Sequence, residues 1–216
     1  MMWRVIPLES RDAVTNLATD EAIMESVGSG GQPTIRFYTW TSPVVSIGFF
    51  QRLNDVKEDN VVRRQTGGGS IHHDPSEISY SIAAREKVFP KDIQQSYEMI
   101  CKYVVDSLKI LGMNPQFQPL NNVMVDDKII CTSAQTRRGG VVMQHGTLFC
   151  KESDSKELTS IMDFGNFDMQ TVYHAMVKGF TSDKKFVFGH KTNEETELMK
   201  ELIHSKYGTQ EWLARR

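Results

Sequence analysis

Alternation of apolar and polar residues predicts most of the strands in this chain. Residues 34–40 (TIRFYTW) and 77–83 (EISYSIA) alternate residue by residue, which is typical of strands with two different faces. Residues 44–50 (VVSIGFF) are apolar on both faces and are predicted as a central strand, within which Gly48 indicates close approach of another backbone or a ligand. Further strands are expected at residues 3–8, 123–125, 128–132 and 141–150.

Apolar residues at steps of three and four predict the helices. The clearest run covers residues 97–111, and Gly112 stops it. An earlier helix is expected from a cap at Asp12 or Thr15 through Val27. Polar helices are expected at residues 157–162, 171–178 and 192–207. Strands interrupted by a few helices predict an α+β domain around a mostly antiparallel sheet.

Length and composition narrow the class of protein. A chain of 216 residues with 39% hydrophobic residues supports one main domain, which we take as residues 1–216. The formal net charge of -2 offers no general basic field, so no nucleic-acid partner is expected. Three cysteines without CxxC spacing argue against a disulfide framework or a structural zinc site. Without a signal peptide or a spanning apolar run, the chain is expected to be cytoplasmic, with no membrane partner.

The most unusual stretch is RRQTGGGSIHHD at residues 63–74, in which we call residues 67–69 the glycine run. Three successive glycines cannot pack a core, and they are inexpensive only where the backbone needs positive φ or close approach. The arginines before the run offer forked donors for carboxylate or phosphate, and the histidines and aspartate after it offer groups that orient and titrate. The stretch therefore indicates main chain wrapped against a ligand. The alternative is a flexible hairpin turn with solvated flanks.

This stretch resembles the Arg-Arg-x-x-Gly-Gly-Gly-x-Val-x-His-Asp signature of lipoate-protein ligases and their octanoyltransferase relatives, with Ile71 at the Val position. Residues 34–51 resemble the segment that precedes the signature. Residues 128–146 (KIICTSAQTRRGGVVMQHG) resemble the family's Lys-Ile-x-Gly-Ser-Ala-Gln followed by Gln-His-Gly. The resemblance implies a biotin/lipoate ligase catalytic domain, with a mostly antiparallel mixed sheet flanked by helices and a fold related to class II aminoacyl-tRNA synthetases.

The resemblance also implies the residues of a site. Lys128 stands at the position of the family's catalytic lysine, which contacts both the acyl carboxylate and the α-phosphate, and Arg64 at that of its phosphate-binding arginine. Without the resemblance, Lys128 reads as a solvated edge-strand lysine and His73 as a buried histidine bonded to backbone. The residues expected to hold ATP are Arg64, Gly67, Gly68, Gly69, Ser70, Ile71, His72 and Lys128, and those expected to contact the acyl group are His73, Lys128, Ser133, Ala134 and His145.

Two departures from the family pattern bear on the chemistry. Asn122 stands where the family usually has aspartate, which removes a carboxylate that could help place Mg²⁺ and leaves the metal ligands unknown. Cys131 takes the place of the glycine in Lys-Ile-x-Gly-Ser-Ala. Strand alternation directs Cys131 and Lys128 to opposite faces, so Cys131 is expected to be an inert, packed thiol.

The resemblance leaves two reaction types and a third possibility. Our main prediction is a lipoate-protein ligase, which uses ATP and Mg²⁺ to activate lipoate or octanoate as acyl-AMP and passes the acyl group to a lysine. The acceptors would be apo lipoyl domains of 2-oxoacid dehydrogenase E2 subunits or the glycine cleavage H protein. The alternative is an ATP-independent octanoyl or lipoyl transferase that uses a cysteine thioester. The third possibility is a non-catalytic acyl-binding member of the fold.

The end of the sequence adds one expectation about partners. Many bacterial ligases of the family carry a small C-terminal accessory domain, for which no residues remain after the predicted helix at 192–207. The resemblance therefore implies a separate accessory protein that would assist adenylation. Trp212 is the candidate anchor for that partner, and the alternative is that its side chain packs on its own domain.

Overall fold

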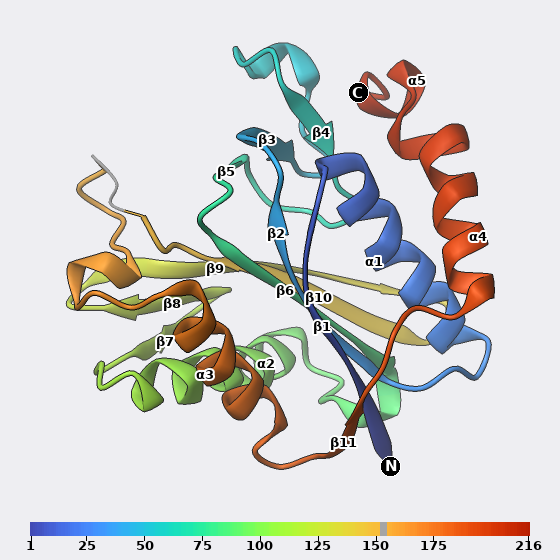
Figure 1. Cartoon of the computed structure of the whole chain (residues 1–216). Helices are drawn as coiled ribbons and strands as arrows, with labels where there is room; N and C mark the ends of the chain where they lie inside the picture. Colours follow the sequence, from blue (N-terminus) through green and yellow to red (C-terminus); the bar gives the residue numbers. More distant parts are fainter. Residues whose placement is uncertain (152–154) are drawn as a thin grey trace.

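A mixed sheet of eight strands forms the centre of the molecule in the computed structural model, which describes residues 1–151 and 155–216 (Figure 1). The strand order is β11-β1-β2-β6-β10-β9-β8-β7. Strand β1 pairs in parallel with β2 and with β11, and every other neighbouring pair in this sheet is antiparallel. The strands are β1 (Met2–Arg11), β2 (Thr34–Trp40), β6 (Ile78–Arg85), β7 (Gln116–Gln118), β8 (Asn122–Val125), β9 (Lys128–Arg138), β10 (Val141–Leu148) and β11 (Lys185–Phe188).

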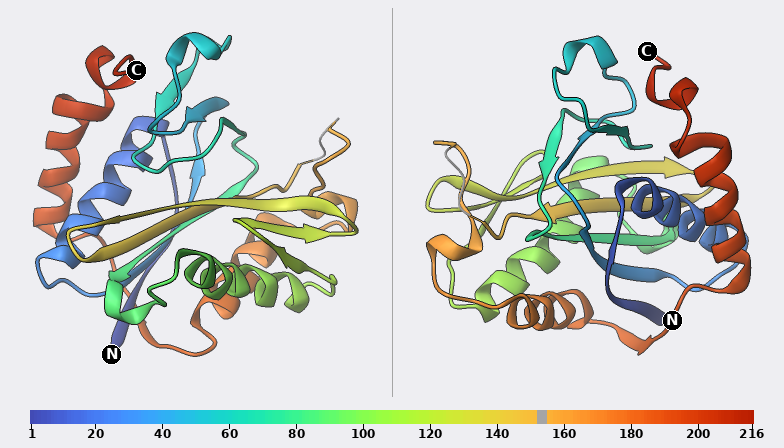
Figure 2. Two further views of the ribbon diagram at one scale, coloured as in Figure 1. Left: turned by 180° about the vertical axis from the view of Figure 1, so that it is seen from behind. Right: turned by 45° about the horizontal axis from the view of Figure 1, so that its top comes forward.

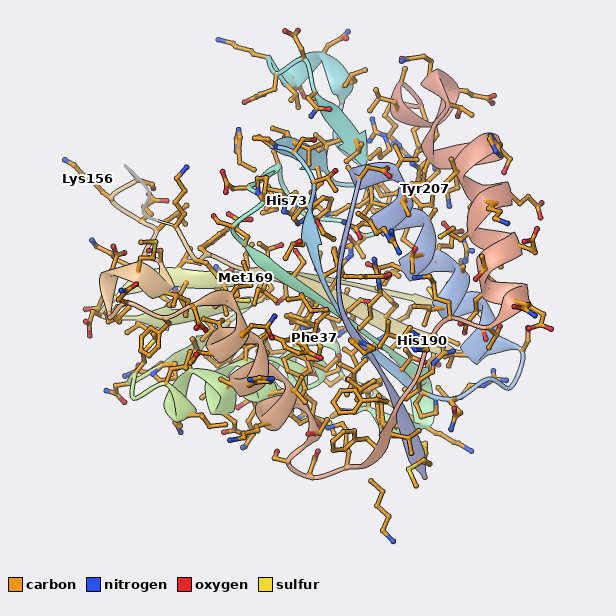
Figure 3. All side chains as sticks on the ribbon, in the orientation of Figure 1. Phe37, His73, Lys156, Met169, His190 and Tyr207 are labelled. Atoms are coloured by element: carbon orange, nitrogen blue, oxygen red, sulfur yellow. The ribbon has the colours of Figure 1, made fainter. Side chains whose placement is uncertain are left out.

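Helices cover both faces of this sheet (Figures 1 and 2). Helices α2 (Ile93–Ile110) and α3 (Met169–Thr181) enclose the larger core on one face, where Phe37 packs edge-on against Tyr173 and Phe180 (Figure 3). Helix α1 (Ala13–Gly28) covers the other face, and α4 (Asn193–Leu202) packs against it. A π-helical turn (Ile203–Tyr207) and the short α5 (Gln210–Leu213) follow α4.

Side-chain caps explain where the helices begin. The Asp12 carboxylate accepts a hydrogen bond from the Thr15 backbone N–H at 2.9 Å, as expected for the start of α1. Asp92 caps α2 in the same way, and Thr192 forms a capping box with Glu195 at the start of α4. Capping residues next to the first turn therefore specify where these three helices begin.

A second sheet of three strands lies beside the end of β2. Its order is β4 (Val61–Arg63), β3 (Val44–Ile47) and β5 (Ile71–His73), with β3 parallel to β4 and antiparallel to β5. The glycine run connects β4 to β5. A Cβ atom placed on Gly48 would lie 2.0 Å from the carbonyl oxygen of Gly68, so the predicted close approach at Gly48 is confirmed.

Some elements of the structure differ from those predicted. The strand expected at 44–50 ends at Ile47, because the chain turns at Gly48 to meet the glycine run. The helix expected at 157–162 is wrong: residues 157–159 instead bond to Ile129, and only the short 3-10 turn Ile161–Asp163 follows. Strand β11 was not expected, because its four residues carry little pattern of their own and depend on pairing with β1.

The acidic turn between β8 and β9 is confirmed. Asp126 and Asp127 have φ of 49° and 59°, which suits the left-handed turn of a two-residue hairpin. Over the described residues, no helix combines the length and apolar character needed to cross a membrane.

Candidate active site

A cavity of about 70 Å³ lies where the glycine run, the three-stranded sheet and the facing ends of β9 and β10 meet. Apolar side chains form one part of its wall, and buried polar groups form the other. The apolar group is Leu17, Tyr38, Trp40, Ile71 and Ala134, and the polar group includes Ser46, Arg64, His73, His145 and the half-buried Asn121. A concave site that combines apolar walls with placed polar groups is typical of small-ligand binding.

Arg64 supports the glycine run from beneath. Its side chain is 4% exposed, and its Nη2 donates to the carbonyl oxygens of Gly67 and Gly69 at 2.8 and 2.6 Å. Its Nη1 donates to the Ser46 carbonyl at 2.8 Å, and its Nε donates to the Thr66 hydroxyl at 3.1 Å. Burial lowers the pKa of Arg64 to about 10, so the guanidinium is charged at neutral pH. Both terminal nitrogens of the guanidinium are therefore hydrogen-bonded to protein carbonyls. The family resemblance had instead led us to expect Arg64 to contact phosphate.

Arg63 holds the turn that follows β3. Its guanidinium donates to the carbonyls of Gly48, Gln51 and Leu213 at 3.0, 2.7 and 2.7 Å. In the other direction, Nε1 of Trp212 donates to the Arg63 carbonyl at 2.9 Å. The Trp212 side chain therefore packs on its own domain, as the alternative interpretation held.

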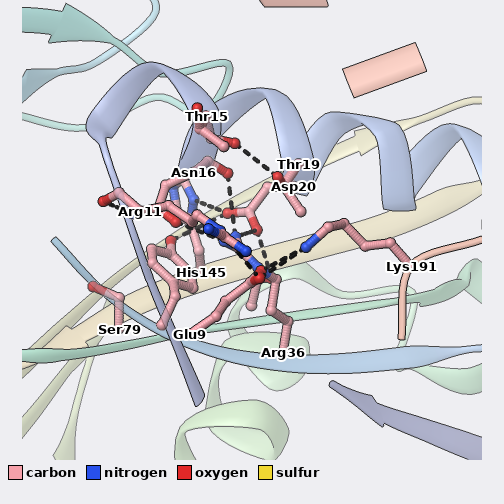
Figure 4. A network of polar contacts seen from close by, with 12 residues as sticks. Glu9, Arg11, Thr15, Asn16, Thr19, Asp20, Arg36, Ser79, His145 and Lys191 are labelled. Carbon is pink, nitrogen blue, oxygen red and sulfur yellow. Dashed lines mark hydrogen bonds and ion pairs between the residues drawn. The ribbon is translucent and has the colours of Figure 1, made fainter. Parts of the chain in front are cut away.

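His145 bridges the cavity to a buried carboxylate on α1. Its Nδ1 lies 3.3 Å from Oδ2 of Asp20, and its Nε2 lies 2.8 Å from the Thr66 hydroxyl. Asp20 is 1% exposed and also accepts hydrogen bonds from Arg36 at 2.9 Å and Ser81 at 2.7 Å (Figure 4). Burial alone would raise the Asp20 pKa, but the His145 hydrogen bond and the Arg36 charge outweigh it and hold the pKa below its usual value.

Sequence reasoning did not find Asp20. The available signal was a pair of acidic residues, Asp20 and Glu21, between the apolar and small residues LAT and AIM, on a helix that the rest of the pattern predicts to be buried. Buried carboxylates are uncommon unless they are paired, so this residue type in that setting indicates a partner. The sequence does not say that the partners would be Arg36 and His145.

His73, labelled in Figure 3, also lines the cavity, and its ring stacks on Trp40 with the ring centroids 4.0 Å apart. Its Nε2 is 2.8 Å from the Ser46 hydroxyl, and its Nδ1 is 3.4 Å from the Thr147 hydroxyl. The side chain therefore bonds to hydroxyls and not to backbone. Burial, together with the nearby Arg64 charge, lowers the pKa of His73 well below its usual value.

Glu77 stands behind His73, with its Oε2 at 3.8 Å from the histidine Nδ1. This side chain is 8% exposed, and burial raises its pKa to about 8. At neutral pH the pair is therefore a neutral imidazole beside a carboxylic acid, and the nearby Arg64 guanidinium keeps its charge.

The other expected site residues fall in three places. Gly68, Gly69, Ile71, Ser133 and Ala134 line the cavity, as does His145. Gly67 faces a neighbouring groove with Phe49, Phe50 and Trp212. Ser70 and His72 are exposed outside the cavity, and His72 pairs with Glu58 at 2.9 Å.

Lys128 lies at the exposed start of β9, outside the cavity. Its displacement follows from a register shift: Val123 pairs with Cys131, but the next residue, Met124, pairs with Ile129. The bulge places one more residue between Lys128 and Ser133 than the family motif has. Counting back from Ser133, Ile129 takes the place of the motif lysine. By the same count Thr132 takes the place of the glycine, whereas counting forward from Lys128 gives Cys131, as we expected from the sequence.

None of the cysteines lines the cavity in the described part of the chain. Cys131 is buried in the larger core, as expected, Cys101 is buried there too, and Cys150 is half-buried. Burial raises the pKa of Cys101 to about 11, that of Cys150 to about 12, and that of Cys131 well above its usual range. Protonated thiols in these positions are poor nucleophiles.

The region of the expected metal contains amides. Asn121 lines the cavity and donates to the Ser133 carbonyl at 2.5 Å, while Asn122 begins β8. Across residues 1–151 and 155–216, no group of three or more His, Cys, Asp or Glu side chains is arranged to hold a metal ion.

The chain is similar in sequence to known proteins. A family model described as the lipoyl protein ligase A/B catalytic domain matches residues 12–182. Octanoyltransferase LipM of Brevibacillus brevis is 28% identical over 277 residues, which cover 99% of each chain. Octanoyltransferase LipM of Staphylococcus aureus is 34% identical over 198 residues, covering 76% of this chain and 71% of its own.

Solved structures give the same fold. A lipoate protein ligase from T. acidophilum with bound lipoic acid has a TM-score of 0.89 at 25% identity, over 99% of this chain and 100% of its own. The bi-partite lipoate protein ligase of Thermoplasma acidophilum, studied with its lipoyl domain, has a TM-score of 0.88 at 26% identity, over 99% of this chain and 96% of its own. The expected α+β fold, a large mixed sheet flanked by helices, is confirmed.

The curated relatives contradict the activity that we expected first. An ATP-dependent, acyl-AMP-forming ligase is the wrong interpretation, because relatives that cover up to 99% of the chain are octanoyltransferases. The geometry agrees with this correction, since Arg64 is engaged with the backbone of the glycine run and Lys128 lies outside the cavity.

Proposed function

The chain belongs to the lipoyl protein ligase A/B catalytic-domain family, and we propose that it transfers an octanoyl group, without ATP, from a thioester donor to a lysine amine of an apo lipoyl domain. The observation that carries the proposal is the set of octanoyltransferase relatives, one of them aligned over the whole length of both chains. The donor would be an acyl carrier protein. The acceptors would be lipoyl domains of 2-oxoacid dehydrogenase complexes or the glycine cleavage H protein.

The charge state of the cavity supports an alkyl chain as its occupant. Burial keeps His73 neutral and Glu77 protonated at neutral pH, and Trp40 covers the histidine ring. Each buried CH₂ group contributes roughly 0.8 kcal/mol, so a medium-chain acyl group gains affinity without a charged partner. A free carboxylate would gain little here, because the nearby Arg64 already donates to protein carbonyls.

The absence of a cavity cysteine from the described residues bears on the route of transfer. We propose direct transfer: the lysine nitrogen attacks the thioester carbonyl carbon, the C–N bond forms, and the C–S bond breaks. The donor sulfur leaves with the proton that the amine loses, so the atoms balance without ATP or an enzyme thioester. Positioning of the two substrates supplies most of the rate in such a reaction. The accessory protein that we expected to assist adenylation has no part in this reaction.

Two parallel assays test the proposal. The purified chain is incubated with an apo lipoyl domain and either octanoyl-loaded carrier protein or free octanoate with ATP and Mg²⁺, and octanoylation is followed by intact-protein mass spectrometry. We expect modification only from the thioester donor. No modification from that donor, with an acceptor that a known octanoyltransferase does modify, would overturn the proposal. Tight binding of octanoate without any transfer would instead favour the non-catalytic alternative.

A further inference from the structure

A groove of about 570 Å³ adjoins the cavity, and the same two segments of the chain line both of them. In the glycine run, Gly68 and Gly69 line the cavity, whereas the preceding Gly67 lines the groove. On β9, Ala134 lines the cavity and the next residue, Gln135, lines the groove. A molecule bound in the groove therefore lies beside the cavity that we assign to the acyl group.

Positive charge distinguishes this groove from the rest of the surface. Its cations are Arg137, Arg138, Lys206 and Arg215, and we call it the cationic groove. Among the described residues that line it there is no aspartate or glutamate. The whole chain has a formal net charge of -2, so the positive charge is a local feature. Walls of one sign attract a ligand or partner of the opposite sign.

Arg215 is held in the groove by aromatic rings and not by an acid. It follows α5, which packs against β4 (Figure 1). Its guanidinium carbon lies 3.9 Å from the ring centroid of Phe49 and 4.7 Å from that of Trp212. Within the part of the chain that the structure describes, this exposed arginine forms no ion pair with a carboxylate. Stacking therefore fixes its position and leaves its charge available to a partner.

The other three cations differ in how far their charge is offset. Arg137 donates at 2.9 Å to each of two backbone carbonyls just before α2, which orient the guanidinium without neutralising it. Arg138 and Lys206 both pair with Glu21, at 3.0 and 2.6 Å. The uncompensated charge of the groove therefore comes mainly from Arg137 and Arg215.

Exposed apolar side chains accompany these cations. Phe50, after β3, is 66% exposed, and Ile93, at the start of α2, is 61% exposed, and both line the groove. Tyr97 and Trp212 line it as well. Aromatic residues and arginine together are typical of the contact regions of protein–protein interfaces. The groove therefore suits a protein partner with an acidic surface.

We propose that the cationic groove docks the acyl donor, a carrier protein with an acidic surface, and that Arg137 and Arg215 bind the phosphate of the arm that carries its thioester. The inference rests on the proposed octanoyl transfer. The donor's arm is joined to its protein through a phosphodiester, an anion that guanidinium groups bind well. The acceptor fits less well, because its reactive group is a lysine, and cations without an offsetting carboxylate repel an ammonium group.

Binding of the carrier protein is measured without catalysis. The probe is a fluorescently labelled acyl carrier protein whose octanoyl group is attached through an amide in place of the thioester, so that it cannot be transferred. Fluorescence anisotropy should show binding that is on the order of tenfold weaker in Arg215→Glu and about threefold weaker in Arg215→Gln, because the charge is reversed in one and removed in the other. Phe50→Ala should also weaken binding. Lys178→Glu makes the same change of charge on α3, outside the groove, and should bind like the wild type.

Transfer kinetics separate this inference from the proposed function. In a wild type that modifies the lipoyl domain, Arg215→Glu should raise KM for the octanoyl carrier protein and leave KM for the lipoyl domain unchanged. A raised KM for the lipoyl domain alone would assign the groove to the acceptor and overturn the proposal. Unchanged probe binding in both Arg215→Glu and Phe50→Ala would overturn it too. A wild type that transfers nothing would refute octanoyl transfer, and the amide probe would still show whether the groove binds the carrier protein.

Discussion

Gly48→Ala tests how the glycine run is held in place. The new Cβ would lie 2.0 Å from the Gly68 carbonyl oxygen, with Gly68 C at 3.0 Å and Gly67 C at 3.1 Å. These are backbone atoms, so no side-chain rotation relieves the contact. The 2.0 Å separation must grow by about 1.4 Å to reach the 3.4 Å at which ordinary contacts begin. One of the two backbone segments must therefore move.

The size of the effect follows from what that movement breaks. Overpacking of this kind costs about 1–3 kcal/mol, and a shift of the run would also lengthen the two charged hydrogen bonds from Arg64 to Gly67 and Gly69. At about 2–4 °C per kcal/mol for a chain of this size, the melting temperature should fall by roughly 2–12 °C. A misplacement on the order of 1 Å beside the cavity should lower the transfer rate by about a hundredfold.

Gly69→Ala is the matched control within the same run. A Cβ on Gly69 meets no atom within 4 Å, and the residue is not among the glycines with positive φ. The melting temperature of this variant, measured by circular dichroism, should be close to that of the wild type. Its rate of octanoylating an apo lipoyl domain should also be close to the wild-type rate. If Gly48→Ala and Gly69→Ala had the same melting temperature and rate, the contact at Gly48 would not position the run.

Further predictions concern the charged and thiol groups. Asp20→Asn removes one of the two carboxylates paired with buried Arg36 and leaves Glu9 as the other, so it should destabilise the fold by about 1–3 kcal/mol, measured by urea unfolding at pH 7. The pKa of Glu77 is raised in the folded state, so its contribution to stability is lost as pH rises from about 4.5 to about 8, and Glu77→Gln should flatten the fall in melting temperature over that range. Lys128→Ala should change the transfer rate less than twofold, because the lysine lies outside the cavity. A larger loss of rate would show that Lys128 takes part in the reaction. A variant with all three cysteines replaced by alanine should still transfer the octanoyl group. If that variant were inactive, and hydroxylamine released an acyl group from the wild-type enzyme, the thioester route would be the correct one.

Local sequence signals found the parts of the site that depend on local geometry. The glycine run and Gly48 were predicted because only glycine suits backbone contacts of this kind. Residues 97–111 were predicted as a helix because its apolar stripe repeats along one face, and the structure has α2 over Ile93–Ile110. In both cases the pattern that specifies the structure lies within a few residues.

Signals were weak where structure depends on distant partners. The bulge in β9 arises from pairing with β8, and it moves Lys128 away from the position that motif spacing implies. Residues 157–159 form an extended contact with Ile129 that overrides their helical tendency. Asp20, Arg36 and His145 come from three elements, and no spacing rule links them.

The hydrogen bonds between Arg63 and residues 212–213 have a consequence for how the protein matures on the ribosome. Arg63 precedes the arginine beneath the glycine run, yet one of its carbonyl partners, Leu213, is 150 positions downstream. A nascent chain that has emerged only through β10 has all of the cavity-lining residues and still lacks this brace. In that chain the turn after β3 keeps the Arg63 hydrogen bonds to Gly48 and Gln51 and lacks those to Leu213. The last residues to be translated therefore complete the support of the turn beside the cavity.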